Sequence, residues 1–290
     1  MKDFSGMYAA LLTAFNKDGS INYEATGMLA ERNIQKGLKG MYVAGSSGEA
    51  MMMSEEERVS LLEYVSRLNK GRVTLIAHVG STSTDAAIRM AKRAAELGYD
   101  AVSAVAPYYY SFSGEAIRGY YTDILNATDL PMLIYNFPAS GGFDGMLSLV
   151  SDMIDNKKLM GVKHTSVNLF ELERFKHMKR PLTVFNGFDE MLIGGLSMGA
   201  DGGIGSTYNF LQDDILAIYA AFKKGDLKKA MEVQEKVNRI IEAMIPFGVF
   251  AMEKAILTEL GIPMGDCRKP FLPLSEAGKA KAKEIAATLK

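Results

Sequence analysis

The 290-residue sequence predicts an α/β fold, a (β/α)8 TIM barrel with a C-terminal helical appendage. Short apolar segments that favour β-strands recur about every thirty residues, shortening to about twenty near the end, with helical patterns between them. This alternation requires a parallel sheet, and eight units without a long interruption indicate closure into a barrel. A doubly wound open sheet is the competing architecture, but no Gly-x-Gly-x-x-Gly motif follows the first strand.

Eight strands are expected, and the segments between them carry helix signals. In chain order the strands cover residues 8–15, 40–44, 73–79, 101–106, 132–136, 160–163, 182–186 and 202–205. Ser54 and Glu57 have the spacing of a capping box, which begins a helix. An apolar stripe at helical spacing within residues 87–94 indicates another helix, and Gly98 follows it as a stop signal.

The chain after residue 209 has a purely helical pattern. Helices are expected at residues 213–224, 227–243 and 248–260, with Gly225 and Pro246 between them. No linker-like stretch precedes this region. We therefore expect a barrel in residues 1–209 and a helical extension, packed on that barrel, in residues 210–290.

Composition and charge narrow the class of protein. A net charge of −1 lacks the basic excess of proteins that bind nucleic acid or anionic membranes, so neither partner is expected. The single cysteine, Cys267, excludes an internal disulfide and a multi-cysteine metal site. Residues 1–6 carry no export signal, and no apolar run approaches the roughly 20 residues that span a bilayer. We expect a cytoplasmic protein.

The sixth expected strand and its end, residues 160–165, contain a lysine suited to covalent catalysis. Side chains alternate along a strand, so Gly161, Lys163 and Thr165 share one face, and in a closed barrel that face can point inward. Desolvation there favours the neutral, nucleophilic amine, which forms Schiff bases with carbonyl substrates. A surface lysine at a strand end is the alternative interpretation for an isolated Lys163.

Other chemistry is sought at the carboxyl ends of the strands, where barrel active sites lie. Ser46 and Ser47 stand between glycines after the second strand, and they could cradle a small carboxylate, although an ordinary glycine turn would look the same. Residues 108–110 after the fourth strand are tyrosines, which relay protons or simply pack at a rim. Tyr135 has the better case for a relay, because the next strand brings Lys163 alongside it.

The last two strands lead to polar, glycine-rich turns. Asp189 and Glu190 follow Gly187, and a serine and a threonine follow Gly205, a combination suited to a polyhydroxylated substrate. A helix N-cap is the alternative role for Asp189. The three histidines lie in different elements without metal-ligand spacing, so no metal is expected.

Several of these segments together carry a family resemblance. They are Gly45-Ser46-Ser47-Gly48-Glu49, Tyr135-Asn136-Phe137-Pro138, Gly161-Val162-Lys163-His164-Thr165-Ser166, Asn186-Gly187-Phe188-Asp189-Glu190, Asp201-Gly202-Gly203-Ile204-Gly205-Ser206-Thr207-Tyr208-Asn209 and Cys267-Arg268-Lys269-Pro270-Phe271. In this order they resemble the N-acetylneuraminate lyase family. That family belongs to the dihydrodipicolinate synthase superfamily, whose members are class I aldolases.

The resemblance implies a role for each matching residue. Lys163 would form the Schiff base with the C2 ketone, and Tyr135 would shuttle the proton as the C3–C4 bond breaks or forms. Ser46 and Ser47 would hold the pyruvate carboxylate. Tyr109 would reach a neighbouring subunit's site and complete a hydroxyl relay with Ser46 and Tyr135. The positions implied to contact the sugar portion are Thr165, Gly187, Asp189, Glu190 and Ser206.

The resemblance also implies small-molecule partners and an assembly. The substrates would be N-acetylneuraminate, pyruvate and N-acetylmannosamine, and the protein would be a homotetramer without a cofactor. Ala139 and Ser140 stand where dihydrodipicolinate synthases have an arginine for their second substrate, which counts against that activity. An aldolase for another 2-keto-3-deoxy sugar acid stays open, as does a non-catalytic relative that keeps the barrel alone.

Overall fold

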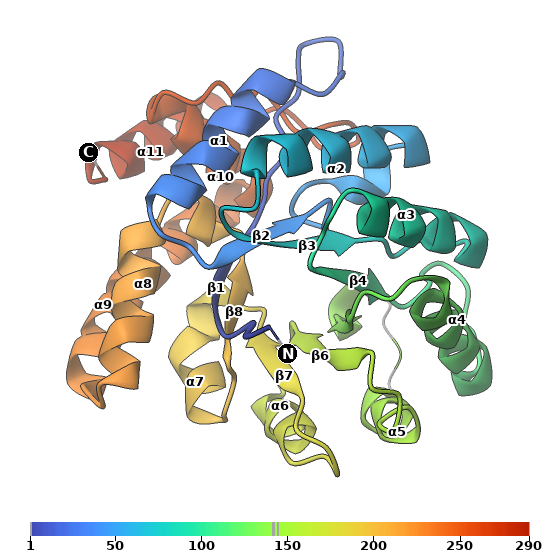
Figure 1. Ribbon diagram of the computed structural model, residues 1–290. Helices are drawn as coiled ribbons and strands as arrows, with labels where there is room; N and C mark the ends of the chain where they lie inside the picture. Colours follow the sequence, from blue (N-terminus) through green and yellow to red (C-terminus); the bar gives the residue numbers. More distant parts are fainter. Residues whose placement is uncertain (1, 141–142, 144, 290) are drawn as a thin grey trace.

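Eight parallel strands close into a barrel in the computed structural model, which describes residues 2–140, 143 and 145–289. The strands are β1 (Gly6–Ala10), β2 (Gly40–Val43), β3 (Thr74–His78), β4 (Ala101–Val105), β5 (Met132–Asn136), β6 (Leu159–His164), β7 (Thr183–Asn186) and β8 (Gly202–Gly205). Each strand pairs in parallel with the next, and β8 pairs back to β1 (Figure 1). The predicted (β/α)8 barrel is confirmed.

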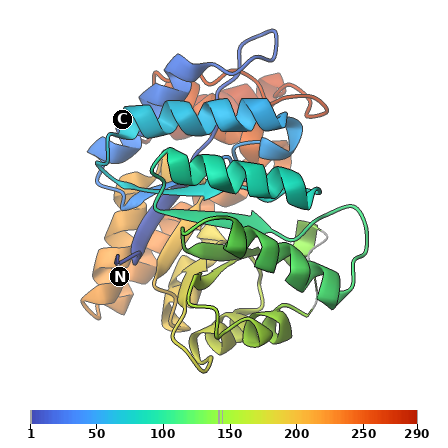
Figure 2. The ribbon, with the colours of Figure 1, turned by 45° about the vertical axis from the view of Figure 1, so that its right-hand side comes forward.

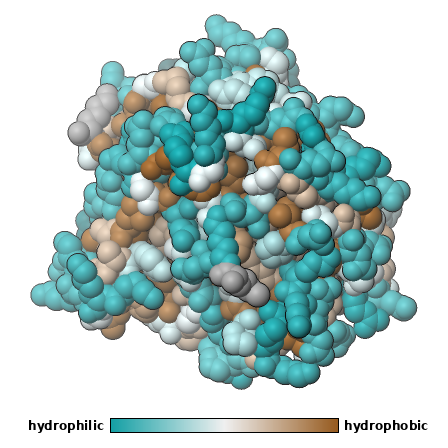
Figure 3. All heavy atoms as spheres, in the orientation of Figure 1, coloured by the Kyte–Doolittle hydropathy of each residue, from teal (hydrophilic) through white to brown (hydrophobic). Residues whose placement is uncertain are grey.

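The helices between the strands form the outer layer. They are α1 (Tyr23–Gln35), α2 (Glu55–Asn69), α3 (Thr84–Glu96), α4 (Gly114–Ala127), α5 (Met146–Asp152), α6 (Leu169–Lys176) and α7 (Leu192–Ser197). Figure 2 shows α2, α3 and α4 side by side along the outside of the sheet. Polar side chains cover much of the face seen in Figure 3, with apolar ones between them, as expected for helices that bury only their inner stripes.

The predicted helix signals have the expected geometry. The backbone N–H of Glu57 donates to Ser54 Oγ at 3.2 Å, and the Ser54 N–H donates to Glu57 Oε2 at 2.9 Å, which completes the capping box. The alanines and methionine of the stripe in α3 are buried. Gly98 follows that helix with a φ of +75°, a conformation that glycine adopts at little cost.

The first strand is the one whose position was predicted wrongly. It spans Gly6–Ala10 instead of residues 8–15. The Leu11 N–H still donates to the Tyr42 carbonyl at 3.0 Å, but the chain then leaves the barrel, and the Phe15 N–H donates to the Met264 carbonyl at 3.0 Å. Residues 11–15 are nevertheless buried, because the C-terminal region covers them. Because the apolar run continues past Ala10 to Phe15, hydrophobicity alone does not show where β1 ends.

The barrel interior is filled by side chains rather than left as a pore. Large inward-facing residues, among them Tyr8, Tyr42, Leu133 and Phe185, form one buried cluster. The outward-facing residues of the strands pack with the helices in a second, larger cluster. Gly161 keeps the wall between β6 and β7 close, since a Cβ there would lie 1.8 Å from the Thr183 carbonyl oxygen.

Four further helices follow the last strand: α8 (Gln212–Lys223), α9 (Leu227–Met244), α10 (Val249–Glu259) and α11 (Glu276–Ala287), with a short 3-10 turn, η5 (Ile245–Phe247), before α10. The Gln212 side chain donates to Asn33 Oδ1 at 2.8 Å, so α8 joins α1 and completes the outer ring. α9, α10 and α11 pack on one another beyond it (Figure 1).

The helix α11 was missing from the sequence prediction, although its signals are present. The Ser275 hydroxyl oxygen accepts the Gly278 N–H at 3.1 Å as an N-cap, and Ala282, Ile285 and Ala286 are buried. Of the helices in the described residues, none is long and apolar enough to cross a membrane.

Candidate active site

A cavity of about 250 Å³ lies at the carboxyl ends of the strands, between the barrel mouth and the helices that follow it. Nine of the ten residues predicted for the site line this cavity: Ser46, Ser47, Tyr135, Lys163, Thr165, Gly187, Asp189, Glu190 and Ser206. They come from the ends of five different strands. The parallel barrel brings these ends together, because every strand runs in the same direction.

Lys163 lies on the inner face of β6, beside the Tyr42 ring of the interior cluster, and is 4% exposed. Its register partner on β5 is Tyr135, as expected from the order of the strands. The Lys163 Nζ atom lies 4.1 Å from the centroid of the Tyr135 ring and 4.6 Å from that of Tyr42. The amine thus opens into the cavity between two aromatic rings.

The cradle loop, residues 44–49, carries Ser46 and Ser47 with both side chains partly exposed to the cavity. Ala44 and Glu49 frame this loop, and both have left-handed backbone conformations, with φ values of 58° and 60°. Such conformations are uncommon for residues other than glycine and persist only where the surroundings enforce them. The loop therefore has a defined shape that depends on its contacts at both ends.

His78 holds the Ala44 end of the cradle loop. Its Nδ1 lies 3.0 Å from the Ala44 carbonyl oxygen, and its Nε2 accepts the Val105 N–H at 3.3 Å. Together these bonds assign the proton to Nδ1. Burial, reinforced by the nearby Arg58 cation, holds the pKa of His78 well below its usual value, so the ring is neutral. A neutral histidine can satisfy both bonds at once.

Asp189 is buried beside the β8 turn, and it does not cap a helix. Its Oδ2 accepts the Thr207 backbone N–H at 2.8 Å and the Thr207 hydroxyl at 2.6 Å. Its Oδ1 has no hydrogen-bond partner among the described residues. Burial raises the pKa of Asp189 to about 6, although the Thr207 bonds act in the opposite direction. One carboxyl oxygen thus fixes the turn, and the other is buried against Gly205 without a hydrogen-bond partner among the described residues.

Two of the glycines at the site are required by close contacts. A Cβ at Gly187 would lie 1.9 Å from Thr165 Oγ1, and one at Gly205 would lie 1.8 Å from Asp189 Oδ1. The side chains of Thr165 and Asp189 therefore occupy the space that larger residues would take. Glu190, by contrast, is exposed at the mouth of the cavity.

The apolar wall of the cavity was not foreseen from the sequence. Phe137 and Phe188 contribute to it from the barrel, while α9, η5 and α10 supply Ile241, Ile245, Val249 and Phe250. Apolar residues at helical spacing are typical of any buried helix face, so no signal separated these four from core residues. The extension is thus part of the site.

Glu253 lies one helical turn from Val249 and Phe250 on α10, and it is fully buried. Neither of its carboxyl oxygens has a hydrogen-bond partner among the described residues. Burial raises the pKa of Glu253 to about 8, although the nearby Ser206 side chain acts in the opposite direction, and the charge of Asp189 adds to the rise. This acid is therefore protonated at neutral pH.

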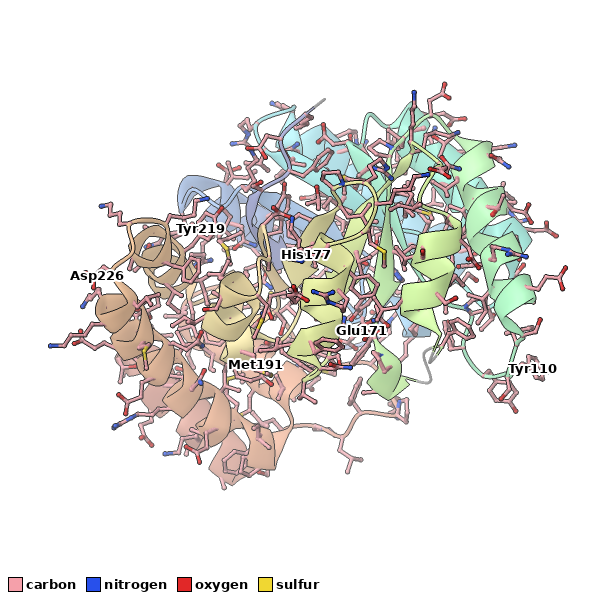
Figure 4. The ribbon with its side chains drawn as sticks, turned by 90° about the horizontal axis from the view of Figure 1, so that it is seen from below. Tyr110, Glu171, His177, Met191, Tyr219 and Asp226 are labelled. Atoms are coloured by element: carbon pink, nitrogen blue, oxygen red, sulfur yellow. The ribbon has the colours of Figure 1, made fainter. Side chains whose placement is uncertain are left out.

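Tyr109 is the one predicted residue outside the cavity. It follows β4 on a loop, has 87% of its surface exposed and a φ of +88°, and packs edge-on against Tyr110 at 5.0 Å between ring centroids. Figure 4 shows Tyr110 projecting away from the body of the molecule. Tyr109 therefore does not line the cavity that holds Lys163.

The described residues contain no group of three or more His, Cys, Asp or Glu placed to hold a metal ion.

A closed (β/α)8 barrel with a buried lysine in a cavity at the carboxyl ends of its strands defines a barrel enzyme. Residues 3–289 match the Dihydrodipicolinate synthetase family. The chain belongs to that family.

Its relatives include N-acetylneuraminate lyases. The chain is 41% identical over 283 residues to the N-acetylneuraminate lyase of Rhizobium meliloti (strain 1021), covering 97% of this chain and 94% of that protein. The solved structure of CdNal from Clostridium difficile, in complex with mannosamine, is 36% identical and superposes with a TM-score of 0.96 over 100% of both chains. A dihydrodipicolinate synthase from Bacillus anthracis superposes with a TM-score of 0.94 at 26% identity, also over 100% of both chains.

Proposed function

We propose that this protein is a class I aldolase that reversibly cleaves N-acetylneuraminate to N-acetylmannosamine and pyruvate. The observation that carries the proposal is the enclosed Lys163, which lies beside Tyr135 in a cavity that also holds the serines of the cradle loop. The names of the relatives at about 40% identity support the same activity. The dihydrodipicolinate synthase from Bacillus anthracis shares the fold, but at 26% its sequence identity to this chain is lower than that of the N-acetylneuraminate lyases.

Lys163 begins the reaction as the nucleophile. Its amine attacks the C2 ketone of the open-chain sugar acid, and loss of water leaves a protonated imine. The imine draws electrons from the C3–C4 bond, which breaks to give an enamine and an aldehyde. Ser46 and Ser47 hold the carboxylate during these steps, so that the ketone carbon lies within reach of Lys163.

Tyr135 relays the proton in the bond-breaking step. Its oxygen takes the proton of the C4 hydroxyl as the aldehyde forms and N-acetylmannosamine leaves, while its own phenolic proton passes to the Ser46 hydroxyl. The same relay returns a proton to C3 of the enamine, which gives the pyruvate imine, and water releases pyruvate from Lys163. The sugar portion is bound by the residues that line the cavity toward its mouth: Asp189, Glu190, Thr165, Gly187 and Ser206.

The proposal extends to the assembly. In a homotetramer, the exposed Tyr109 of one subunit completes a hydroxyl relay with Ser46 and Tyr135 of its neighbour. An aromatic side chain that is 87% exposed on a left-handed backbone supports this assignment, because strained positions persist where they serve binding. The protein acts in the cytoplasm, on small molecules and without a cofactor.

The direct test is a coupled assay for pyruvate release from N-acetylneuraminate. We expect release by the intact protein and none by Lys163→Ala. Reduction with borohydride in the presence of pyruvate should inactivate the intact protein, and mass spectrometry should locate the adduct on the peptide that contains Lys163. An adduct on another residue, or full activity without any adduct, would exclude the Schiff-base mechanism.

A further inference from the structure

The Cys267–Phe271 segment, which belongs to the family resemblance but has no part in the proposed reaction, returns to the barrel beside the cradle loop. The backbone N–H of Arg268 donates to Glu49 Oε2 at 2.7 Å. Glu49 is the last residue of the cradle loop, and 219 positions separate it from Arg268 in the sequence. The C-terminal region therefore contacts the loop that we assign to carboxylate binding.

The Arg268 guanidinium joins three segments around this contact. It donates to the Met52 carbonyl at 2.9 Å, just after the cradle loop, and to Glu57 Oε2 at 2.8 Å in the first turn of α2. It also donates to the Gly19 carbonyl from Nη2 at 2.7 Å, which ties in the β1–α1 connection. A planar fork with five donors is suited to such multiple contacts, and a lysine ammonium cannot reproduce them.

A buried ion pair reinforces the same end of the loop. Glu49 pairs with Lys254 of α10, and both side chains are essentially inaccessible to solvent. The Lys254 ammonium also lies 4.3 Å from the centroid of the Phe15 ring, against which Arg268 packs at 4.4 Å. We call Glu49, Lys254 and Arg268 the clamp. A buried pair contributes little net stability but restricts its partners to one geometry.

We propose that the clamp positions the cradle loop, so that Glu49 and Arg268 act as positioning residues for carboxylate recognition; this inference rests on the proposed function. Glu49 has the left-handed backbone that ends the loop, and its side chain is the one the clamp holds. Without that hold the backbone at Glu49 relaxes to an ordinary conformation, and Ser46 and Ser47 move away from the carboxylate. Misplacement of binding groups by about 1 Å is enough to cost about 10²-fold in rate.

The test compares two ketones that form an imine with Lys163. Pyruvate carries the carboxylate that the cradle loop recognises, and acetone lacks it. In each case the amine bonds to the ketone carbon, water leaves, and cyanoborohydride delivers a hydride that converts the imine to a secondary amine. The rate of labelling at Lys163, measured by mass spectrometry, then separates carboxylate recognition from general damage to the site.

Arg268→Lys is the principal variant, and Arg180→Lys is its matched control. Arg180 donates to the carbonyl oxygens of Ile154 at 3.0 Å, Asn156 at 3.2 Å and Leu159 at 2.6 Å, at the opposite end of the barrel. Arg268→Lys should slow labelling by pyruvate about 10- to 10²-fold and leave labelling by acetone within about twofold. Arg180→Lys should leave the ratio of the two rates unchanged.

A double variant, Glu49→Gln with Lys254→Met, removes the buried pair without leaving a lone buried charge, and the same loss of preference for pyruvate is expected from it. Equal losses with both ketones, or no loss with either, would overturn the clamp's positioning role. If the intact protein itself is not labelled at Lys163 by pyruvate, the proposed function fails, and that result is separate from any effect of Arg268.

Discussion

Glu253 should make the stability of the protein depend on pH above the range in which carboxylates normally titrate. It is fully buried, and its pKa rises from 4.5 to about 8 in the folded state. The folded protein therefore holds a proton that the unfolded chain releases above about pH 4.5. The free energy of unfolding must fall as the pH rises through this window, and the decline ends once Glu253 ionises in the folded protein.

The size of the effect follows from the shift. Each pKa unit corresponds to about 1.4 kcal/mol, so the shift of Glu253 from 4.5 to about 8 amounts to a loss on the order of 5 kcal/mol across the whole window. Glu253→Gln has nearly the same shape and carries no ionisable proton. The free energy of unfolding of the variant minus that of the unaltered protein should therefore rise by about 3 kcal/mol from pH 5.5 to 8.5, because only the unaltered protein loses stability as the pH rises.

Urea denaturation at several pH values and a fixed protein concentration measures this difference. Asp189 is present in both proteins, so its own titration largely cancels. Glu259→Gln changes an exposed glutamate on the same helix and should show no such trend with pH. A constant difference between Glu253→Gln and the unaltered protein over this range would mean that Glu253 is already ionised at neutral pH, and the reasoning from burial would be wrong.

Three other outcomes are expected. EDTA should leave turnover unchanged, because imine formation rather than a Lewis acid activates the carbonyl. Asp189→Leu should lower the efficiency with N-acetylneuraminate while imine formation with pyruvate survives, and loss of the Thr207 bonds should cost about 1–3 kcal/mol of stability. Tyr109→Phe should lose about 10²–10⁴-fold in rate. Mixing it with inactive Lys163→Ala under subunit exchange should restore activity, since one mixed site then has both an intact lysine and an intact tyrosine.

Each of these outcomes has a clear opposite. Activity lost to EDTA and regained with zinc or magnesium would contradict the mechanism without a metal. If Asp189→Leu abolishes imine formation as well, Asp189 serves the fold rather than the sugar. If native mass spectrometry shows exchanged subunits but no activity returns, Tyr109 acts within its own chain.

The strands were predictable because a barrel strand is apolar on both faces and its end is marked by polar or glycine residues. That regularity located Lys163 and Tyr135 on neighbouring strands, and the structure pairs them. It failed at the first strand, where the apolar run continues to Phe15 under the C-terminal region. Burial there comes from a segment some 250 positions away, which no local pattern reveals.

The contribution of the extension could not be predicted for the same reason. Glu253 and Lys254 are charged residues on a helix, and such residues usually face solvent. Both are buried here, and the partner of Lys254 is Glu49 in the distant cradle loop. Tyr109 is a different case. The role proposed for it requires a second copy of the chain, and no local pattern in one sequence indicates where a second subunit lies.

Two parts of the chain contribute to the site: the barrel supplies the reactive side chains, and α9, η5 and α10 supply an apolar wall. Lysine, tyrosine and serines belong to the barrel, whereas Ile241, Ile245, Val249 and Phe250 come from the helices that follow it. Changes in those helices can therefore reshape the space for the departing aldehyde without moving a reacting atom. A library confined to these four positions offers a route to aldolases for new aldehydes that retain pyruvate chemistry.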